Sequence, residues 1–202
     1  MGSMEDVQKI RVNTSKPHTP NLPGSEGVWI LIFGDMMVFG LFFGTYLFYR
    51  SANIEMYYTS QSSLNEFFGL LNTIVLLTSS WFVVWAVRLA KSGAKKATAN
   101  RIVIAILLGL GFCVVKGIEY SAKFSEGHTI ISNEFFMFYF MLTGIHLVHV
   151  TIGLGALSFV YFKIKTQGIN ENNVTTLETS GIFWHLVDLL WVVLFALLYL
   201  VR

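Results

Sequence analysis

The sequence predicts an all-α polytopic membrane protein, a bundle of five transmembrane helices. Its 202 residues are 54% hydrophobic and only 13% charged, whereas about a quarter of the residues in a soluble domain are charged. Five apolar runs each approach or exceed the ~20 residues that a spanning helix needs. The alternation typical of barrel strands is absent from these runs, so we expect the spans to be helices.

The first 26 residues are predicted to form a flexible polar N-terminal arm. They contain Pro17, Pro20 and Pro23 and no apolar stretch of the kind that a signal peptide would have. Ser25 is a candidate N-cap for the first helix. Residues 27–202 then form one membrane domain, with spans at about 27–49, 67–90, 102–122, 135–162 and 181–201.

Small residues recur at close spacing in these spans and predict tight helix packing, since they let helix backbones approach one another. The first span has Gly40 and Gly44, and the third has Gly109 and Gly111. The fourth has Gly144, Gly153, Gly155 and Ala156. The single Cys113 lies in an apolar run and is read as a small core residue, with no disulfide or Cys-pair metal site.

Orientation follows from the Lys and Arg residues of the connections. Basic residues concentrate in the N-terminal arm and in the second and fourth loops, which hold Arg88, Lys91, Lys95, Lys96, Arg101, Lys163 and Lys165. All three segments fall on one side if the N-terminus is cytoplasmic, and the C-terminus is then periplasmic. The net charge of +2 is too small to indicate nucleic-acid binding.

The spans also contain ionisable residues, which are costly in a bilayer unless they find partners. They are Asp35 in the first span, Lys116 and Glu119 in the third, His146 and His149 in the fourth, and His185 and Asp188 in the fifth. At ~1.5 Å rise per residue, Asp35, Asp188 and the histidines reach similar mid-to-inner depths. Lys116 and Glu119 lie nearer the outer surface.

Each group has alternative interpretations. Lys116 and Glu119, three residues apart, are expected to form a local ion pair or to snorkel outward. The histidines are expected to be neutral hydrogen-bonding ties between helices, and the alternative is a haem or metal site made by His146, His149 and His185. Asp35 has no basic neighbour within a helical turn, and burial would favour its neutral form. It is therefore either a proton carrier or a neutral hydrogen-bonding acid.

Four strings occur in order along the chain: FGDMMVFGLFFGTYLFYR (33–50), LLNTIVLLTSSW (70–81), TGIHLVHVTIGL (143–154) and FWHLVDLLW (183–191), with a weaker one, KGIEY (116–120). Together they resemble subunit III of the haem–copper oxidases over residues 24–201. The chain lacks the first two of that subunit's seven helices, like subunit III of bacterial quinol oxidases. It looks most like the five-helix NorE branch associated with nitric oxide reductase.

The resemblance implies a cofactor-free accessory subunit in a bacterial inner membrane. Haem with copper or iron would lie in a partner, the catalytic subunit I. Subunit III in this family holds phospholipid in a cleft between its first two helices and the rest, and it supports proton uptake and stability. Asp35 matches a buried carboxylate of the family. Glu119, His149, His185 and Asp188 match positions that the family holds as polar, whereas Lys116 stands where many members are uncharged.

We therefore expect no catalytic, cofactor-binding or metal-binding residue in this chain. Asp35 would be protonatable, and His149, His185 and Asp188 would be interhelical ties. One rival is a free-standing haem-binding membrane oxidoreductase that uses the three histidines. A small transporter using Asp35 and Asp188 is a third class, but the proline-broken helices that would support it are not present in the spans.

Overall fold

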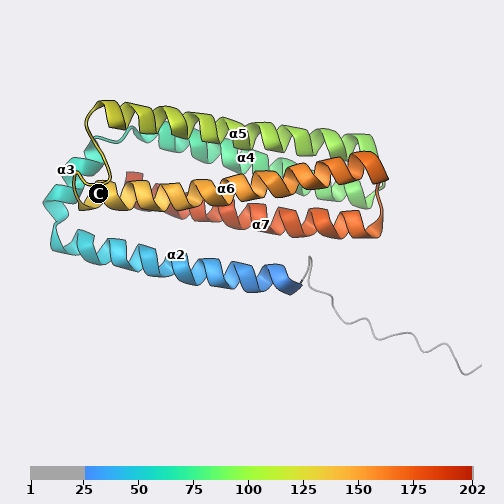
Figure 1. Ribbon diagram of the computed structural model, residues 1–202, viewed down its shortest axis with the longest axis horizontal. Coiled ribbons are helices and arrows are strands. Elements are labelled where there is room, and N and C mark those ends of the chain that lie inside the picture. Colours follow the sequence, from blue (N-terminus) through green and yellow to red (C-terminus); the bar gives the residue numbers. More distant parts are fainter. Residues whose placement is uncertain (1–25, 202) are drawn as a thin grey trace, which may run out of the picture.

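The structure, a computed structural model, describes residues 26–201, and within them the chain is helical with no strand (Figure 1). The elements are α2 (Glu26–Ala52), α3 (Ile54–Ser62), α4 (Glu66–Lys91), α5 (Lys95–Ser125), α6 (Glu134–Gln167), α7 (Glu171–Phe195) and a final π-helical turn, η1 (Ala196–Leu200). The N-terminal arm and its Ser25 cap lie outside the described residues.

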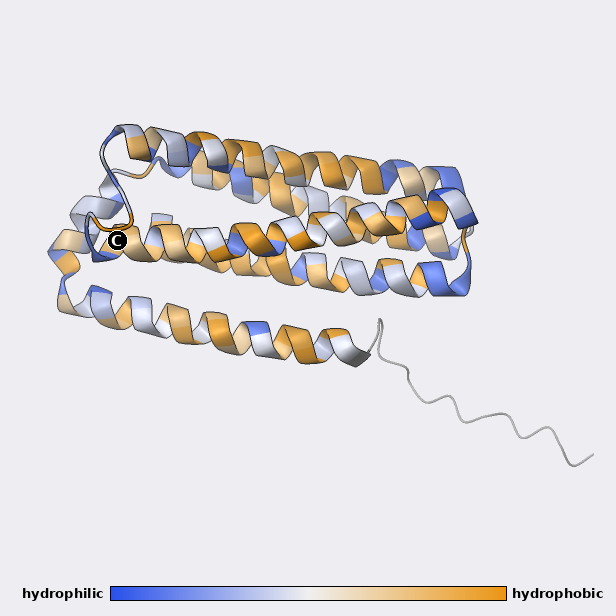
Figure 2. Cartoon of the chain, viewed as in Figure 1, coloured by the Kyte–Doolittle hydropathy of each residue, from blue (hydrophilic) through white to orange (hydrophobic). Residues whose placement is uncertain are grey.

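Five of these helices are long and apolar enough to cross a membrane, which confirms the predicted class. Hydropathy is highest along their middles, and polar residues gather at the two ends of the bundle (Figure 2). The chain is thus an integral membrane protein. The predicted spans lie inside longer helices: the fifth was expected to begin at residue 181, but α7 begins at Glu171.

Three of the helices begin with the same capping pattern, which allows polar residues to form the first turn. An asparagine followed by a glutamate stands at the start of α4, α6 and α7: Asn65–Glu66, Asn133–Glu134 and Asn170–Glu171. Each asparagine side chain accepts a hydrogen bond from a backbone N–H of the first turn, and each glutamate favours the positive end of the helix dipole. Capped in this way, polar turns extend the helices beyond the hydrocarbon region.

The connection between the first two predicted spans contains a further helix, α3. It has nine residues and lies across the end of the bundle, between α2 and α4 (Figure 1). Its Tyr57 and Gln61 are buried, and Ser60 accepts a hydrogen bond from the side chain of Asn133. The polar composition of this segment gives a weak helical signal, because tertiary contacts rather than hydropathy hold it.

The end of the bundle where α3 lies is held together by Lys123, close to the end of α5. Its ammonium group donates to the Ser63 carbonyl oxygen (2.7 Å) and to the Glu126 carboxylate (2.6 Å). The hydrogen bond and charge of Lys123 lower the pKa of Glu126. Lys123 therefore joins the end of α5 to the turn between α3 and α4.

Helix α7 is the centre of the bundle and α2 is its most peripheral member. α7 packs against both α4 and α6, and α5 closes the bundle between them, whereas α2 has fewer contacts along α6 and α7. The start of α2 and the two basic loops, α4–α5 and α6–α7, lie at the same end of the molecule (Figure 1). This is the arrangement that the orientation prediction requires; which side faces the cytoplasm remains a prediction.

Trp184 of α7 lies in close contact with three neighbouring helices. Its ring lies between Gly109 of α5 and Gly153 of α6, where an added Cβ would come within 2.9 Å and 2.6 Å of ring atoms. Its indole N–H donates to Ser79 Oγ of α4 (3.1 Å), and Ser79 in turn donates to the Ala105 carbonyl oxygen of α5 (2.9 Å). A single aromatic side chain therefore connects four helices.

Candidate functional site

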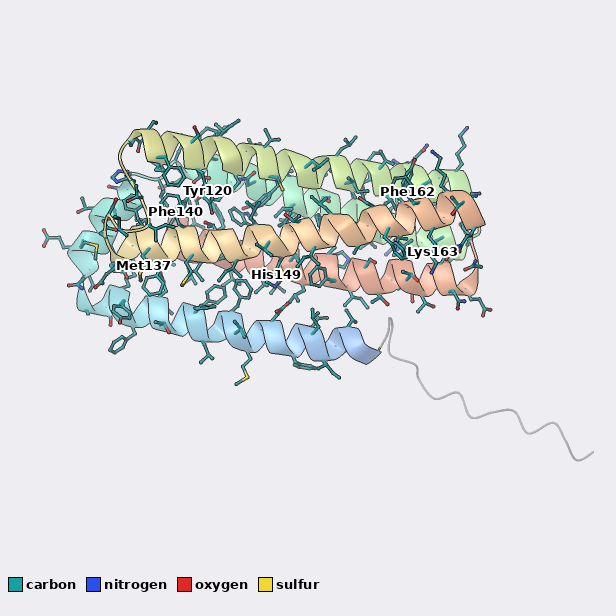
Figure 3. All side chains as sticks on the ribbon, in the orientation of Figure 1. Tyr120, Met137, Phe140, His149, Phe162 and Lys163 are labelled. Carbon is teal, nitrogen blue, oxygen red and sulfur yellow. The ribbon has the colours of Figure 1, made fainter. Side chains whose placement is uncertain are left out.

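Asp35 and His149 face each other across the interface of α2 and α6. The Nε2 of His149 is 3.3 Å from Oδ2 of Asp35, and their side chains are 17% and 23% exposed. His149 lies on the side of α6 that faces α2 (Figure 3). Asp35 has no basic neighbour within a turn of its own helix, and His149 of α6 provides one from across the interface.

The second ring nitrogen decides what this pair can do chemically. Nδ1 of His149 lies 2.9 Å from the Ile145 carbonyl oxygen. A carbonyl only accepts hydrogen bonds, so we assign a proton to Nδ1. With Nδ1 protonated, Nε2 of the neutral imidazole is an acceptor, so a proton on the Asp35 carboxyl, or a second proton on the imidazole, would join the two groups across α2 and α6. Without that proton the imidazole lone pair would face a carboxylate, and no hydrogen bond would connect the two helices here.

The surroundings of the pair are aromatic. Phe39 of α2 contacts the His149 ring edge-on at 5.6 Å, and Phe183 of α7 stacks on it at 6.4 Å between centroids. Helices α2, α6 and α7 therefore all position the imidazole. The exposed parts of the Asp35 and His149 side chains lie within membrane-spanning helices. A lipid or protein that covers them would therefore control the access of protons to the pair.

His185 lies on the interface of α7 with α4. Its Nδ1 is in close contact with Ser80 Oγ of α4, while Oδ2 of Asp188 is 3.9 Å from the same nitrogen, beyond hydrogen-bonding distance. His185 thus connects two helices through a serine that the sequence analysis did not single out. Asp188 is buried, and neither of its carboxyl oxygens has a well-formed hydrogen bond among the described residues, although the Ser80 hydroxyl interacts with the carboxyl group. The expected interhelical tie through Asp188 is therefore not seen as a hydrogen bond.

Lys116 and Glu119 form a fully buried ion pair, with 3.1 Å between Nζ and Oε2. Lys116 also donates to the hydroxyl oxygens of Tyr139 (3.2 Å) and Tyr199 (2.9 Å). Both tyrosines donate to the other carboxylate oxygen of Glu119. The local pair is present and the lysine does not snorkel, because α6 and η1 provide polar partners inside the bundle.

The rings around this ammonium group add cation–π contacts. Nζ of Lys116 lies 4.8 Å from the Tyr139 ring centroid, 5.1 Å from that of Trp191 and 5.5 Å from that of Tyr199. All three N–H directions of the lysine have acceptors. A buried ion pair whose hydrogen bonds are all satisfied restricts the helices around it to one arrangement. We interpret this cluster as structural.

His146 is completely buried between the rings of Phe112 and Trp191, at centroid distances of 5.7 Å and 5.3 Å. It does not join the other two histidines in a ligand set. Among residues 26–201, no three His, Cys, Asp or Glu side chains are arranged to hold a metal ion. The histidine set of the haem-binding rival is therefore not assembled in this fold.

Comparison with known proteins decides the family. The family model for cytochrome c oxidase subunit III matches residues 25–201, nearly the whole described bundle. The chain belongs to the cytochrome c oxidase subunit III family. The resemblance carried by the four sequence motifs is thereby confirmed, while the nitric oxide reductase branch remains a prediction.

Relatives in this family match along most of their length. The chain is 29% identical to a probable cytochrome c oxidase subunit 3 of Mycobacterium leprae, over 94% of both chains. It is 28% identical to a cytochrome c oxidase subunit 3 of Bacillus sp. strain PS3, over 86% of this chain and 84% of the relative. It is equally similar, with the same coverage, to a cytochrome bo(3) ubiquinol oxidase subunit 3 of Buchnera aphidicola.

Proposed function

We propose that this protein is a cofactor-free accessory subunit of a respiratory haem–copper oxidase or nitric oxide reductase in a bacterial inner membrane. Its partner is the catalytic subunit, which carries haem together with copper or iron. The observation that carries the proposal is the match of residues 25–201 to the subunit III family. The relatives named above include subunits of cytochrome c oxidases and of a ubiquinol oxidase. The family alone therefore leaves the electron donor open.

The positions of the histidines support a chain without its own haem. His149 is directed at Asp35 and the Ile145 carbonyl oxygen, and His185 at Ser80. His146 is enclosed by aromatic rings. A pair of axial ligands has to face a common haem iron, and these three side chains have different neighbours.

Within this role, we assign proton handling to Asp35 and His149. The pair brings two ionisable groups together across α2 and α6 and is partly exposed, and Asp35 lies on α2, the spanning helix with the smallest buried share. A partner subunit or lipid against α2 and α6 would regulate the access of water to it. The buried Lys116–Glu119 pair is less suited, since its hydrogen bonds are all made inside the protein.

The test is purification of the tagged chain in mild detergent, followed by an absorption spectrum before and after the co-purifying polypeptides are separated. We expect a Soret band that follows a second, larger polypeptide and is absent from the isolated chain. The identity of that polypeptide chooses between an oxygen reductase and a nitric oxide reductase. A Soret band that stays with the isolated chain would overturn the proposal and support the haem-binding rival.

A further inference from the structure

The last turns of α4 present an aromatic and basic surface that the proposed function does not use. Four residues related by three- and four-residue steps share one face of this helix: Trp81, Val84, Trp85 and Arg88. They line a hollow of about 180 Å³. Both tryptophans are exposed, at 61% and 37% of their surface.

A second hollow, of about 300 Å³, lies beside the first, between α4 and α7. Its lining is Val84, Val87, Arg88, Lys91, Glu178, Gly181, Ile182 and His185. Val84 and Arg88 belong to both hollows. The two hollows therefore adjoin at Val84 and at the guanidinium group of Arg88.

The charges around Arg88 are not balanced. Lys91 is paired with Glu178 at 2.6 Å, but no carboxylate of residues 26–201 pairs with Arg88 in the described contacts. Arg101 of α5 adds a second cation, with its guanidinium carbon 3.8 Å from the Trp85 ring centroid. An anionic group would complement this surface.

The depth of these residues matches the layers of a phospholipid. Arg88 is in the last turn of α4, next to the basic loop, and Trp81 is seven residues deeper, about 10 Å along the helix. Tryptophan favours the boundary between headgroups and hydrocarbon.

We propose that this surface binds one anionic diacyl phospholipid of the leaflet next to the basic loops. Its phosphate contacts Arg88, and its two acyl chains lie in the hollows on either side of Val84. The site is formed by α4 and α7. It does not need the two helices that the family's lipid cleft requires and this chain lacks, and it does not depend on the proposed function.

The proposal is tested by tryptophan quenching in bilayers. The full chain carrying Trp29→Phe is placed in phosphatidylcholine vesicles with increasing fractions of phosphatidylglycerol brominated on its acyl chains, or of phosphatidylcholine brominated in the same way. Trp184 and Trp191 are buried, so quenching reports on Trp81 and Trp85. We expect half-maximal quenching at a several-fold lower fraction of the brominated phosphatidylglycerol.

Two variants locate the effect. Arg88→Leu should abolish the preference for phosphatidylglycerol, whereas Lys95→Leu, which removes an equal charge from the start of α5 outside both hollows, should keep it. The unfolding temperature of each variant checks the fold, and Arg88→Gln replaces Arg88→Leu if the latter does not fold. Equal quenching by the two lipids, or equal loss in the Lys95 variant, would overturn the proposal.

Discussion

The contact between Trp184 and Gly153 allows the packing of the bundle to be tested with a single methyl group. A Cβ at Gly153 would lie 2.6 Å and 2.8 Å from two ring carbons of Trp184. The ring has little freedom to move, because Gly109 lies against its other edge and Ser79 accepts its indole N–H. Gly153→Ala must therefore displace either the tryptophan or α6.

Gly155→Ala is the matched control for this substitution. It lies two residues along the same helix, and a Cβ there meets nothing within 4 Å. Both changes gain the same helix propensity, about 1 kcal/mol, so this contribution cancels between them. Overpacking a close contact costs about 1–3 kcal/mol. We expect Gly153→Ala to be less stable than Gly155→Ala by that amount.

The assay is reversible unfolding of the purified chain in mixed detergent micelles, with tryptophan fluorescence and helical circular dichroism as independent probes. Gly155→Ala should equal or exceed the parent in its free energy of unfolding, and Gly153→Ala should fall below both. If the two alanine variants unfold alike, Trp184 is not confined between α5 and α6 and the packing argument is wrong.

Three further predictions concern the buried polar groups. Asp35→Asn should leave assembly intact, since an amide can still donate to His149, but it should change turnover of the complex or its pH dependence; kinetics unchanged across pH would argue against a proton role. Asp188→Leu removes a buried carboxyl that has no well-formed hydrogen bond in the described structure. Burying such a group destabilises the fold by about 1–3 kcal/mol, so the isolated variant should melt no lower than the parent. A lower melting temperature would show that this carboxyl does hold helices together. Lys116→Met should cost about 3–5 kcal/mol by leaving Glu119 buried without its cation, and Lys116→Met with Glu119→Gln should recover most of it; a double variant as unstable as the single would contradict the ion-pair interpretation.

Hydropathy predicted the membrane spans because burial in lipid requires long apolar runs whatever their neighbours. It placed the starts of α2, α4 and α6 within one residue but missed those of α5 and α7, which begin at Lys95 and Glu171. The first turns of α7 are polar, and their signal was the Asn170 cap followed by an acidic residue. The same capping signal stands at the starts of α4 and α6, so capping read together with hydropathy would have placed the start of α7 as well.

The polar partners were harder to predict. Asp35 and His149 were each recognised as buried ionisable residues, and the depth estimate placed them at a comparable level, but only the packing of α2 on α6 pairs them. Tyr139 and Tyr199 lie within apolar runs and give no local sign of their hydrogen bonds to Lys116 and Glu119. Ser80 was one of several hydroxyl residues in its span. Such pairings depend on helix rotation, which small differences in packing determine.

The central claim is that this chain is an accessory subunit and does not itself carry the redox centres. It is tested most directly by purifying the catalytic partner from cells with and without this protein and comparing haem absorbance with sustained turnover. The account predicts an unchanged haem spectrum without the chain, together with turnover that is slower or decays sooner. Loss of a haem band in proportion to the missing chain would contradict it.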